Sequence, residues 1–487
     1  MLKTKSQKIL QWETKHYVLN VVTYVINTLI IAGLFILAVY LNGVTGGTNL
    51  EDYLQGLATP LHFLVLLIII VAIMVFYFLY EDKNFLRSAS NSEMLFLIIE
   101  LALVACFISG KYVNTYFRPL ALVAILTLFL TNRRTAIFMN VVFCLFIFLF
   151  DSFASSTVVV GNYPSLIMGF SSGIIATLCT DKVFSRMKLL MLSILISVPS
   201  LVCVVMTVIE HGGQTIVSDL ISSVASGPLA VALFMILLPL FESWFKRVSC
   251  FKFSELIEHN SKLIKKMIQQ APGTFNHSIV VSNIAEACAV AIGEDGLLAR
   301  TCAYYHDIGK LRRPEFFKEN QADGFNPHDD LTPELSANII KSHTQDGYDL
   351  IMKSRLPKEI ADVCREHHGT LPILYFYGKA QKYTDGKVDL EQFSYAGPKP
   401  STKIAAIIMI ADGCEAAART LQDRSRENVK NVVRKIVNER MQLGQFDDCE
   451  ITLKEINIII HTVVNHLTGV YHSRIEYPKV SLEGMDL

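Results

Sequence analysis

The sequence contains neither a C-x-x-C pair nor a dense cysteine cluster, although it has ten cysteines. This scatter argues against a disulfide framework or a zinc knuckle, and it suits a reduced, intracellular setting for the polar half of the chain. Lysine and arginine together number 44, as do aspartate and glutamate, so there is no basic excess to neutralise phosphates. We therefore expect no nucleic-acid polymer as a partner.

Charged residues are scarce in the first half of the chain, where long apolar runs take their place. Hydrophobic residues make up 52% of the 487 residues, and the mean hydropathy is +0.39. The apolar runs extend from residue 17 to residue 245, and a composition typical of soluble proteins begins near Val248. We predict a transmembrane domain at 1–247, a linker at 248–272 and a soluble domain at 273–487.

A membrane-spanning helix needs about 20 mostly apolar residues. We interpret eight segments as spans: 17–41, 61–80, 94–110, 119–131, 134–151, 163–180, 188–209 and 219–243. The fourth and fifth segments are almost continuous, and together they are too long for one crossing, so we expect a tight hairpin. Glu100, inside the third segment, is either a functional carboxylate or a packing contact.

The distribution of lysine and arginine predicts the orientation of these segments. With the N-terminus inside the cell, the outer loops hold only Lys111 and Arg118, and the other basic residues of this half lie in inner segments. Eight crossings then return the soluble domain to the cytoplasm of a multi-pass plasma-membrane protein. A cleaved signal peptide is the alternative for the first run, but the run is too long and no clear A-x-A site follows it.

Runs of β-branched residues with a period of two are absent from the soluble half, which argues against a sheet. Helical periodicity is present instead, with proline, glycine and aspartate between the helical segments. The segments are 276–292, 296–311, 333–354, 358–368, 402–421, 427–443 and 453–470. We predict an all-α protein, in which a polytopic transmembrane bundle is followed by a cytoplasmic all-helical domain.

Five histidines and two aspartates of this domain stand at chemically suggestive positions: His277, His306, Asp307, His343, His367, His368 and Asp412. A lone helical histidine is more often a surface or core residue than a ligand. Asp412, however, ends the apolar run 407–412, and a buried carboxylate needs a partner charge, hydrogen bonds or a metal. Imidazole and carboxylate suit Mn, Fe or Zn. Two such ions sharing one carboxylate can activate water for attack on phosphorus.

The order His, His-Asp, Asp resembles the signature of the HD superfamily of metal-dependent phosphohydrolases. Over residues 250–480, and more loosely in the spans, the chain resembles PgpH-type seven-transmembrane HD-domain proteins, the cyclic di-AMP phosphodiesterases. The runs that carry this resemblance are Ala271-Pro272-Gly273-Thr274, Tyr304 to Lys310, Glu319-Asn320-Gln321, Asn326-Pro327-His328-Asp329, His367-His368-Gly369-Thr370, Gly397-Pro398-Lys399-Pro400 and Ala411-Asp412.

The resemblance implies a two-metal hydrolase that is anchored in the membrane and opens cyclic di-AMP to linear pApA, with Mn or Fe as the ions. The ligands of the first ion would be His277, His306, Asp307 and Asp412. Those of the second would be Asp307, His343, His367 and His368, with Asp307 as the bridge.

Three further residues are candidate substrate contacts. The resemblance implies that Lys310 contacts the substrate phosphate or assists the leaving oxygen, and a solvated cation at a helix end is the alternative. We also expect Tyr305 and Arg419 to touch the substrate. The expected partners are a cyclic dinucleotide, the lipid bilayer and a second copy of the chain in a homodimer.

The chain departs from the family pattern at two places. Family members usually carry a large extracellular domain after the first span, whereas residues 42–60 form only a short loop here. Phe393-Ser394-Tyr395-Ala396 stands where the family tends to have Phe-Arg-Tyr-Pro, which puts any role of that arginine in doubt.

Two other functions stay open. One is an HD enzyme for cyclic di-GMP or mononucleotides, and the other is a non-catalytic membrane receptor that binds a nucleotide. Enzymes for cyclic di-GMP carry Gly-Tyr-Pro after the histidine pair. Here that pair is followed by Gly369-Thr370-Leu371-Pro372, which argues against this substrate.

Overall fold

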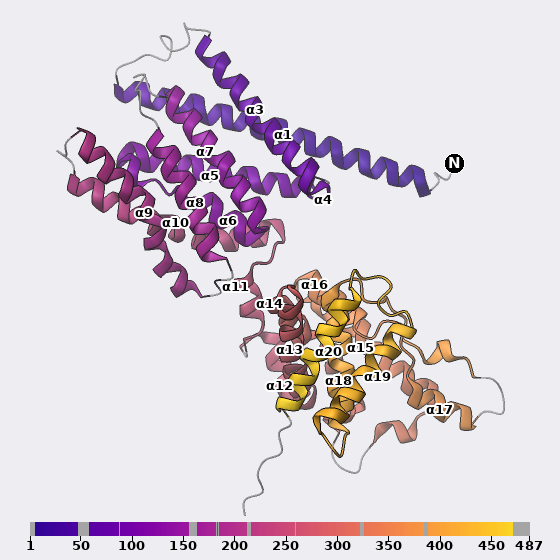
Figure 1. The fold of residues 1–487 in the computed structure, drawn as a ribbon. Helices are drawn as coiled ribbons and strands as arrows, with labels where there is room; N and C mark the ends of the chain where they lie inside the picture. The colour runs from indigo at the N-terminus through magenta and orange to yellow at the C-terminus, as the bar shows by residue number, and fades with distance from the viewer. Residues whose placement is uncertain are drawn as a thin grey trace, which may run out of the picture. The chain divides into compact units, whose positions relative to one another are not determined.

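A computed structural model describes residues 5–46, 58–86, 88–154, 163–181, 183, 185–211, 216–258, 260–321, 326–383 and 388–470. The chain divides into two compact units, Met1–Ser249 and Cys250–Leu487. Over the described ranges both units are built from helices without a strand (Figure 1), and the one extended pairing is an isolated bridge between Pro372 and Ser394. The predicted all-α class is confirmed.

The first unit is a bundle of apolar helices. Its elements are α1 (Lys5–Gly46), α3 (Ala58–Glu81), α4 (Lys83–Leu86), α5 (Ala89–Tyr112), η1 (Thr115–Phe117), α6 (Leu122–Leu130), α7 (Arg133–Ala154), α8 (Tyr163–Thr180), α9 (Arg186–His211) and α10 (Ile216–Phe245). Six of them, α1, α3, α5, α7, α9 and α10, are long and apolar enough to cross a membrane, and α6 and α8 are shorter apolar helices. Residues 47–57, most of the expected short loop, lie outside the described residues.

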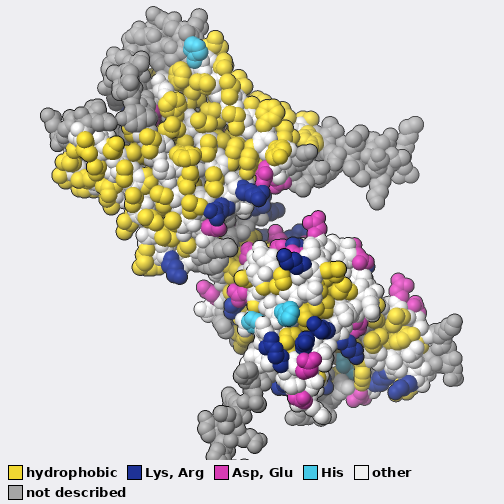
Figure 2. All heavy atoms as spheres, in the orientation of Figure 1, with side chains coloured by type: hydrophobic (Ala, Val, Ile, Leu, Met, Phe, Trp, Pro, Cys, Tyr) yellow, Lys and Arg dark blue, Asp and Glu magenta, His cyan; other side chains and the backbone are white. Residues whose placement is uncertain are grey.

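The outer surface of this bundle is apolar, as a lipid environment requires. Figure 2 shows hydrophobic side chains over most of the visible face of the first unit, with basic side chains near one edge. Leu29 and Phe76 are 67% and 71% exposed, which would be costly in water but is favourable in a bilayer. The first unit is thus a multi-pass membrane domain.

The fourth and fifth predicted spans form an antiparallel pair, α6 and α7. Arg118, before α6, pairs with Asp151 near the end of α7 at 2.6 Å. At the start of α7, Arg134 pairs with Glu81 at the end of α3 at 2.8 Å. The chain therefore passes from one end of α7 to the other between residues 118 and 133. The nine-residue α6 is shorter than expected, about 14 Å, and nearly all of it is buried in the bundle.

The second unit contains α11 (Cys250–Leu256), α12 (Lys262–Gln270), α13 (Pro272–Ile292), α14 (Gly296–Tyr305), η2 (Ile308–Arg312), η3 (Pro314–Phe316), η4 (Lys318–Asn320), η5 (Pro327–Asp330), α15 (Pro333–Lys353), α16 (Lys358–Glu366), α17 (Leu374–Tyr383), η6 (Leu390–Phe393), α18 (Lys403–Arg419), α19 (Arg426–Gln442) and α20 (Leu453–Val470). The expected linker at 248–272 is therefore largely helical. Phe251, Ile264 and Met267 are buried, so α11 and α12 are parts of this unit rather than a free connector.

Helix α13 belongs to the core of the second unit. By length and composition alone α13 could cross a membrane, since its mean hydropathy is 1.3. Apolar side chains of its inner face are instead buried within the unit, where Val281, Ile284 and Cys288 are at most 1% exposed. Because α13 packs on α14, α18 and α20, we assign it to the core of the second unit and not to the membrane.

Local signals fix the ends of the helices that carry the site. Gly293 ends α13 in the left-handed conformation, with φ of 86°, which glycine adopts without strain. The side chain of Asp295 then caps α14 by accepting a hydrogen bond from the backbone N–H of Leu298. Thr332 and Thr402 cap α15 and α18 in the same way. With their ends fixed in this way, α13, α14, α15 and α18 carry the residues of the candidate site described below.

Candidate metal centre

The structure brings all seven predicted ligands to one place in the second unit. His277 lies in the first turns of α13, and His306 and Asp307 follow the last turn of α14. His343 lies in the middle of α15, the His367-His368 pair follows α16, and Asp412 lies on α18. Residues separated by up to 135 positions therefore meet, which only the packing of these helices can achieve.

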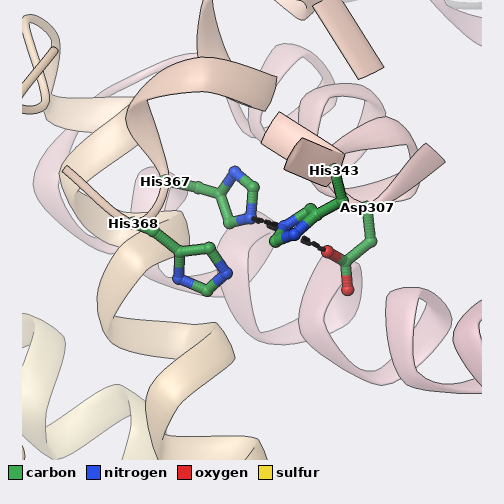
Figure 3. A group of neighbouring side chains, drawn as sticks. All are labelled: Asp307, His343, His367 and His368. Carbon is green, nitrogen blue, oxygen red and sulfur yellow. Dashed lines mark hydrogen bonds and ion pairs between the residues drawn. The ribbon is translucent and has the colours of Figure 1, made fainter. Parts of the chain in front are cut away.

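Asp307 stands at the centre of the cluster and is 1% exposed. Its Oδ2 atom lies 3.3 Å from Nε2 of His306 and 3.7 Å from Nε2 of His277. Its Oδ1 atom faces the other way, 3.4 Å from Nε2 of His343 and 3.7 Å from Nε2 of His367 (Figure 3). Both oxygens are buried, and apart from the ammonium of Lys310 near Oδ2 neither has a regular hydrogen-bond partner among the described residues. Such a carboxylate is suited to hold cations on both sides.

Three of the imidazoles are fixed in the tautomer that a metal ligand needs. Nδ1 of His306 lies 2.7 Å from the carbonyl oxygen of Ala303, and Nδ1 of His343 lies 2.6 Å from that of Ile340. Nδ1 of His367 makes the same contact with Cys364 at 2.9 Å. A carbonyl can only accept, so each Nδ1 donates. In its neutral form each of these rings therefore presents the lone pair of Nε2 toward Asp307.

The rings of His343 and His367 face each other with their Nε2 atoms 3.3 Å apart. Burial lowers the pKa of His343 to about 3, and burial also lowers the pKa of His368 well below its usual value. At neutral pH His343 is thus uncharged, and its Nε2 carries a lone pair. Lone pairs that converge beside a buried carboxylate make a donor set for a divalent cation.

On the other side of Asp307, two acids from α18 hold His277. Its Nδ1 lies 2.7 Å from Oε2 of Glu415, and its Nε2 lies 3.0 Å from Oδ1 of Asp412. Burial opposes a charge on this ring, but the hydrogen bonds to Asp412 and Glu415 outweigh that effect and raise the pKa of His277 to about 10. The environment therefore stabilises positive charge at Nε2, whether a proton or a metal ion carries it.

Lys310 lies beside the carboxylate of Asp307. Its ammonium is 2.7 Å from Oδ2 of Asp307 and 2.9 Å from Oε1 of Glu319. Although burial opposes the charge on Lys310, the carboxylates of Asp307 and Glu319 raise its pKa above the usual value. The same ammonium and His306 hold the pKa of Asp307 well below its usual range, against the effect of burial. Lys310 is therefore a firmly charged group of the site and not a solvated helix end.

The two other expected substrate contacts differ in position. Tyr305 is fully buried, and its hydroxyl donates to the carbonyl of Leu256 at 2.7 Å and lies 3.0 Å from Oγ of Ser261. It therefore fixes α11 and α12 against α14 and cannot reach a substrate, which corrects the prediction. Arg419 is 45% exposed and pairs with Glu415, so it borders the site through that acid.

Three residues of the site were not predicted from the sequence. Glu415 holds His277, Glu319 holds Lys310, and the ring of Tyr395 stacks on His368 with centroids 4.4 Å apart. The i, i+3 spacing of Asp412 and Glu415 in an apolar helix was a usable signal, because it places both acids on one face. Tyr395 gave no such signal, because it lies in the irregular segment between η6 and α18.

The donor atoms meet the distance requirement for metal sites. Two groups have ligand atoms that all lie within 4.8 Å of one another: Asp307, His343, His367 and His368 form one, and His277, His306 and Asp307 form the other. Asp412 adjoins the second group and lies 3.8 Å from Nδ1 of His368. The cluster could therefore hold metal ions, with nitrogen and oxygen ligands and no thiolate.

Comparisons with known proteins agree with this assignment. Residues 58–249 match the family model of 7TM receptors with intracellular HD hydrolase, and residues 274–417 match the model of the HD domain. The first match covers α3, α5, α6, α7, α8, α9 and α10, and α1 precedes it. The second match covers all seven residues of the metal centre.

Two curated relatives align with most of the chain. The cyclic-di-AMP phosphodiesterase PgpH of Bacillus subtilis is 36% identical over 91% of this chain and 62% of its own length. Its namesake from Listeria monocytogenes is 35% identical over 84% of this chain and 58% of its own length. The chain thus spans about three fifths of the length of these relatives.

A solved structure also aligns with the second unit. The crystal structure of the PgpH HD domain of Listeria monocytogenes has 46% sequence identity and covers 44% of this chain and 100% of that one, with a TM-score of 0.42. With a transmembrane match and an HD match in this order, the chain belongs to the family of seven-transmembrane receptors with an intracellular HD hydrolase domain.

Proposed function

We propose that this protein is a membrane-anchored phosphodiesterase that hydrolyses cyclic di-AMP to linear pApA. The observation that carries the proposal is the buried Asp307 carboxylate, whose two oxygens face two separate sets of imidazoles. A shared carboxylate between two nitrogen-rich sets fits a two-metal phosphohydrolase. The names of the two curated relatives support the cyclic dinucleotide as substrate.

The proposed cofactors are two divalent transition-metal ions, Mn or Fe. His277, His306, Asp307 and Asp412 would hold one, and Asp307, His343, His367 and His368 the other. When bound, such ions supply an activated water and neutralise charge on the phosphoryl oxygens. The nitrogen and carboxylate donors favour these metals over soft ions, which prefer thiolates.

The chain's own residues would bind and orient the phosphate. Lys310 is the nearest ammonium to the bridging carboxylate, and its raised pKa makes it a poor proton donor at neutral pH. We therefore assign it to phosphate binding rather than to protonation of the leaving oxygen. Tyr395 lies against His368 on the side of the second ligand set, where an adenine or ribose could contact its ring. Arg419 stays a candidate contact at the border.

The membrane arrangement is part of the proposal. Apart from the four-residue α4, seven α-helices of the first unit fall within the seven-transmembrane match and α1 lies before it, which supports eight passages of the chain. Together with the lysine and arginine distribution, this count supports both termini and the HD domain in the cytoplasm. The homodimer stays a prediction from the sequence.

A substrate panel tests the activity. The full chain, purified in detergent and loaded with Mn²⁺ or Fe²⁺, would be incubated with cyclic di-AMP, cyclic di-GMP, ATP and a short RNA, and the products separated by chromatography. We expect cyclic di-AMP to disappear and pApA to appear, and removal of the ions by a chelator to stop the reaction. Equal or faster turnover of another substrate would contradict the assignment, and binding of cyclic di-AMP without turnover would favour a receptor.

A further inference from the structure

The first unit contains a cavity that the proposed hydrolase does not use. Its volume is about 500 Å³, within the range of small-molecule sites. It is lined by the later turns of α1 and α5, by η1, by the end of α7 and by the start of α8. Protein interiors are otherwise closely packed, with few voids larger than a water molecule. A lined space of this size is therefore a candidate binding site.

The cavity lies at the membrane face opposite the one where α10 ends. Asn114, on its wall, donates from its side chain to Asp219 at 3.0 Å and to Ser222 at 2.9 Å, and both partners lie in the first turns of α10. The hydroxyl of Tyr116 donates to Thr207, near the end of α9, at 2.9 Å. These bonds fix η1 beside the cavity. In the predicted orientation this face is the outer one.

Arg118 is held in a fixed position on the cavity wall. Its guanidinium donates to Oδ2 of Asp151 at 2.6 Å and to Oγ of Ser165 at 3.0 Å. A Cβ atom on Gly110 would stand 2.4 Å from Nε of Arg118, so only a glycine leaves room for this arginine. Its side chain is 13% exposed. The charges of Arg118 and Asp151 largely cancel.

Lys111 adds a cation that no acid balances among the wall residues that the structure describes. The wall carries Lys111, Arg118 and Asp151 as its charged residues, which gives a formal sum of +1. Nζ of Lys111 donates to the carbonyl of Leu41 at 2.5 Å. An ammonium has three donors, so a neutral carbonyl neither uses them all nor compensates the charge.

One part of the wall is apolar. Leu103, Ile147 and Phe150 line the cavity and are at most 7% exposed, and Phe107 lies beside Lys111 with the ammonium 5.7 Å from its ring centre. A fixed cation beside apolar side chains matches a ligand that has a negative end and a hydrophobic body.

We propose that this cavity binds a small organic anion, in which a carboxylate or phosphate contacts Lys111 and an apolar body lies against α5 and α7. Two sources share this chemistry: a soluble anion from outside the bilayer, or the headgroup region of an anionic lipid. The proposal does not depend on the hydrolase activity, because all the residues that carry it lie in the first unit.

Binding is tested on the full chain in nanodiscs of phosphatidylcholine. The probes are benzoate and phenyl phosphate, and the readout is isothermal titration calorimetry. We expect saturable binding of at least one probe, weakened at least about tenfold by Lys111→Gln, because a hydrogen bond to a charged group is lost. Lys188→Gln is the matched control, since Lys188 is an exposed lysine of α9 that does not line the cavity. It should bind like the wild type.

Charge reversal guards against a variant that merely misfolds. Lys111→Glu should lose benzoate and gain benzylammonium, and a misfolded protein would bind neither. In nanodiscs of phosphatidylglycerol, unchanged benzoate binding identifies a soluble anion as the occupant, and competitive loss of binding identifies the anionic lipid. The proposal is overturned if the wild type binds no probe in nanodiscs of either lipid. It is also overturned if Lys111→Gln binds the probes as tightly as Lys188→Gln does.

Discussion

Glu415 accepts a hydrogen bond from Nδ1 of His277 at 2.7 Å, and this bond aims the opposite nitrogen of the ring at Asp412 and Asp307. The acid is 1% exposed, so the bond is shielded from water. Glu415 lies one turn after Asp412 on α18. One helix therefore supplies both a candidate ligand and the group that positions its neighbour.

Glu415→Gln should weaken metal binding about 10- to 100-fold at the set that contains His277, because the amide orients the imidazole less strongly than a carboxylate. Metal titration of the purified second unit, followed by calorimetry, measures this loss. The control is Glu427→Gln, which changes an exposed acid at the start of α19. Unchanged metal affinity in Glu415→Gln would show that the acid has only a packing role.

Asp307→Ala should remove both ions and abolish hydrolysis, because each ligand set loses its shared carboxylate. His343→Ala should retain the ion on the side of His277 and lose most of the activity, because that side is untouched. Metal content and turnover are measured on the same samples, and circular dichroism checks the fold. A folded Asp307→Ala protein with near-normal turnover would refute the two-metal mechanism.

Gly309→Ala should destabilise the second unit by at least about 3 kcal/mol. A Cβ atom there would stand 1.9 Å from the carbonyl oxygen of His343 and 2.5 Å from the backbone nitrogen of Gly347, so η2 could no longer lie against α15. Gly378→Ala, in α17, is the control, because its Cβ would meet nothing within 4 Å. Urea unfolding compares the two. Similar stabilities would show that η2 and α15 can separate at little cost.

The metal-free second unit should be most stable near pH 6 to 7. The pKa of His343 is about 3 in the folded state and lies near 6.5 when unfolded. As the pH falls below 6.5 the unfolded state takes up the proton first, so the free energy of unfolding drops by up to about 1.4 kcal/mol per pH unit. The pKa of His277 is raised to about 10 in the folded state. The protonated ring therefore stabilises the folded state fully below pH 6.5, and this stabilisation is lost as the pH rises toward 10.

Urea unfolding in the presence of a chelator, repeated between pH 4 and pH 9, measures this curve. In His343→Ala the free energy of unfolding should fall less steeply as the pH drops below 6.5, because one proton fewer is taken up on unfolding. His461→Ala, at an exposed position of α20, should leave the curve unchanged. A stability that rises steadily toward low pH would contradict the assignment of a buried, neutral His343.

Reporter fusions after Glu81, Tyr112 and Leu487 test the membrane orientation. In the predicted topology an enzyme that is active only outside the cell should work after Tyr112 and fail after Glu81 and Leu487. A fluorescent protein that folds only in the cytoplasm should give the opposite pattern. An externally active reporter after Leu487 would overturn either the orientation or the even number of passages, and the reporters after Glu81 and Tyr112 would show which of the two is wrong.

Much of the fold could be predicted because its signals are local. Apolar runs of about 20 residues located the spans, and the helical periodicity of the second half located its helices. The short length of α6, and the place of α11 and α12 in the second unit, were harder to predict. For such short segments, contacts with the rest of the fold decide how they pack, and the length of the apolar run does not. The candidate ligands could also be picked out by residue type, because His306-Asp307 and His367-His368 are unusual pairs.

The contacts around the ligands could not be predicted in the same way. Tyr305 has an aromatic ring beside the ligand His306, yet the course of α14 turns its hydroxyl toward Leu256. Tyr395 reaches His368 only through the irregular chain between η6 and α18. Such positions depend on tertiary packing, which no single-sequence pattern encodes.

The helix that carries His277 is apolar enough to enter a bilayer, and yet it packs into the core of the second unit. During synthesis it follows the last spanning helix, so the insertion machinery meets a further hydrophobic stretch soon after α10. Its polar residues, among them Asn276, His277 and Glu286, raise the cost of insertion. A substitution such as His277→Leu would lower that cost as well as remove a candidate ligand. A loss of the proposed activity by such a variant in cells would therefore combine a chemical defect with an error of membrane topology.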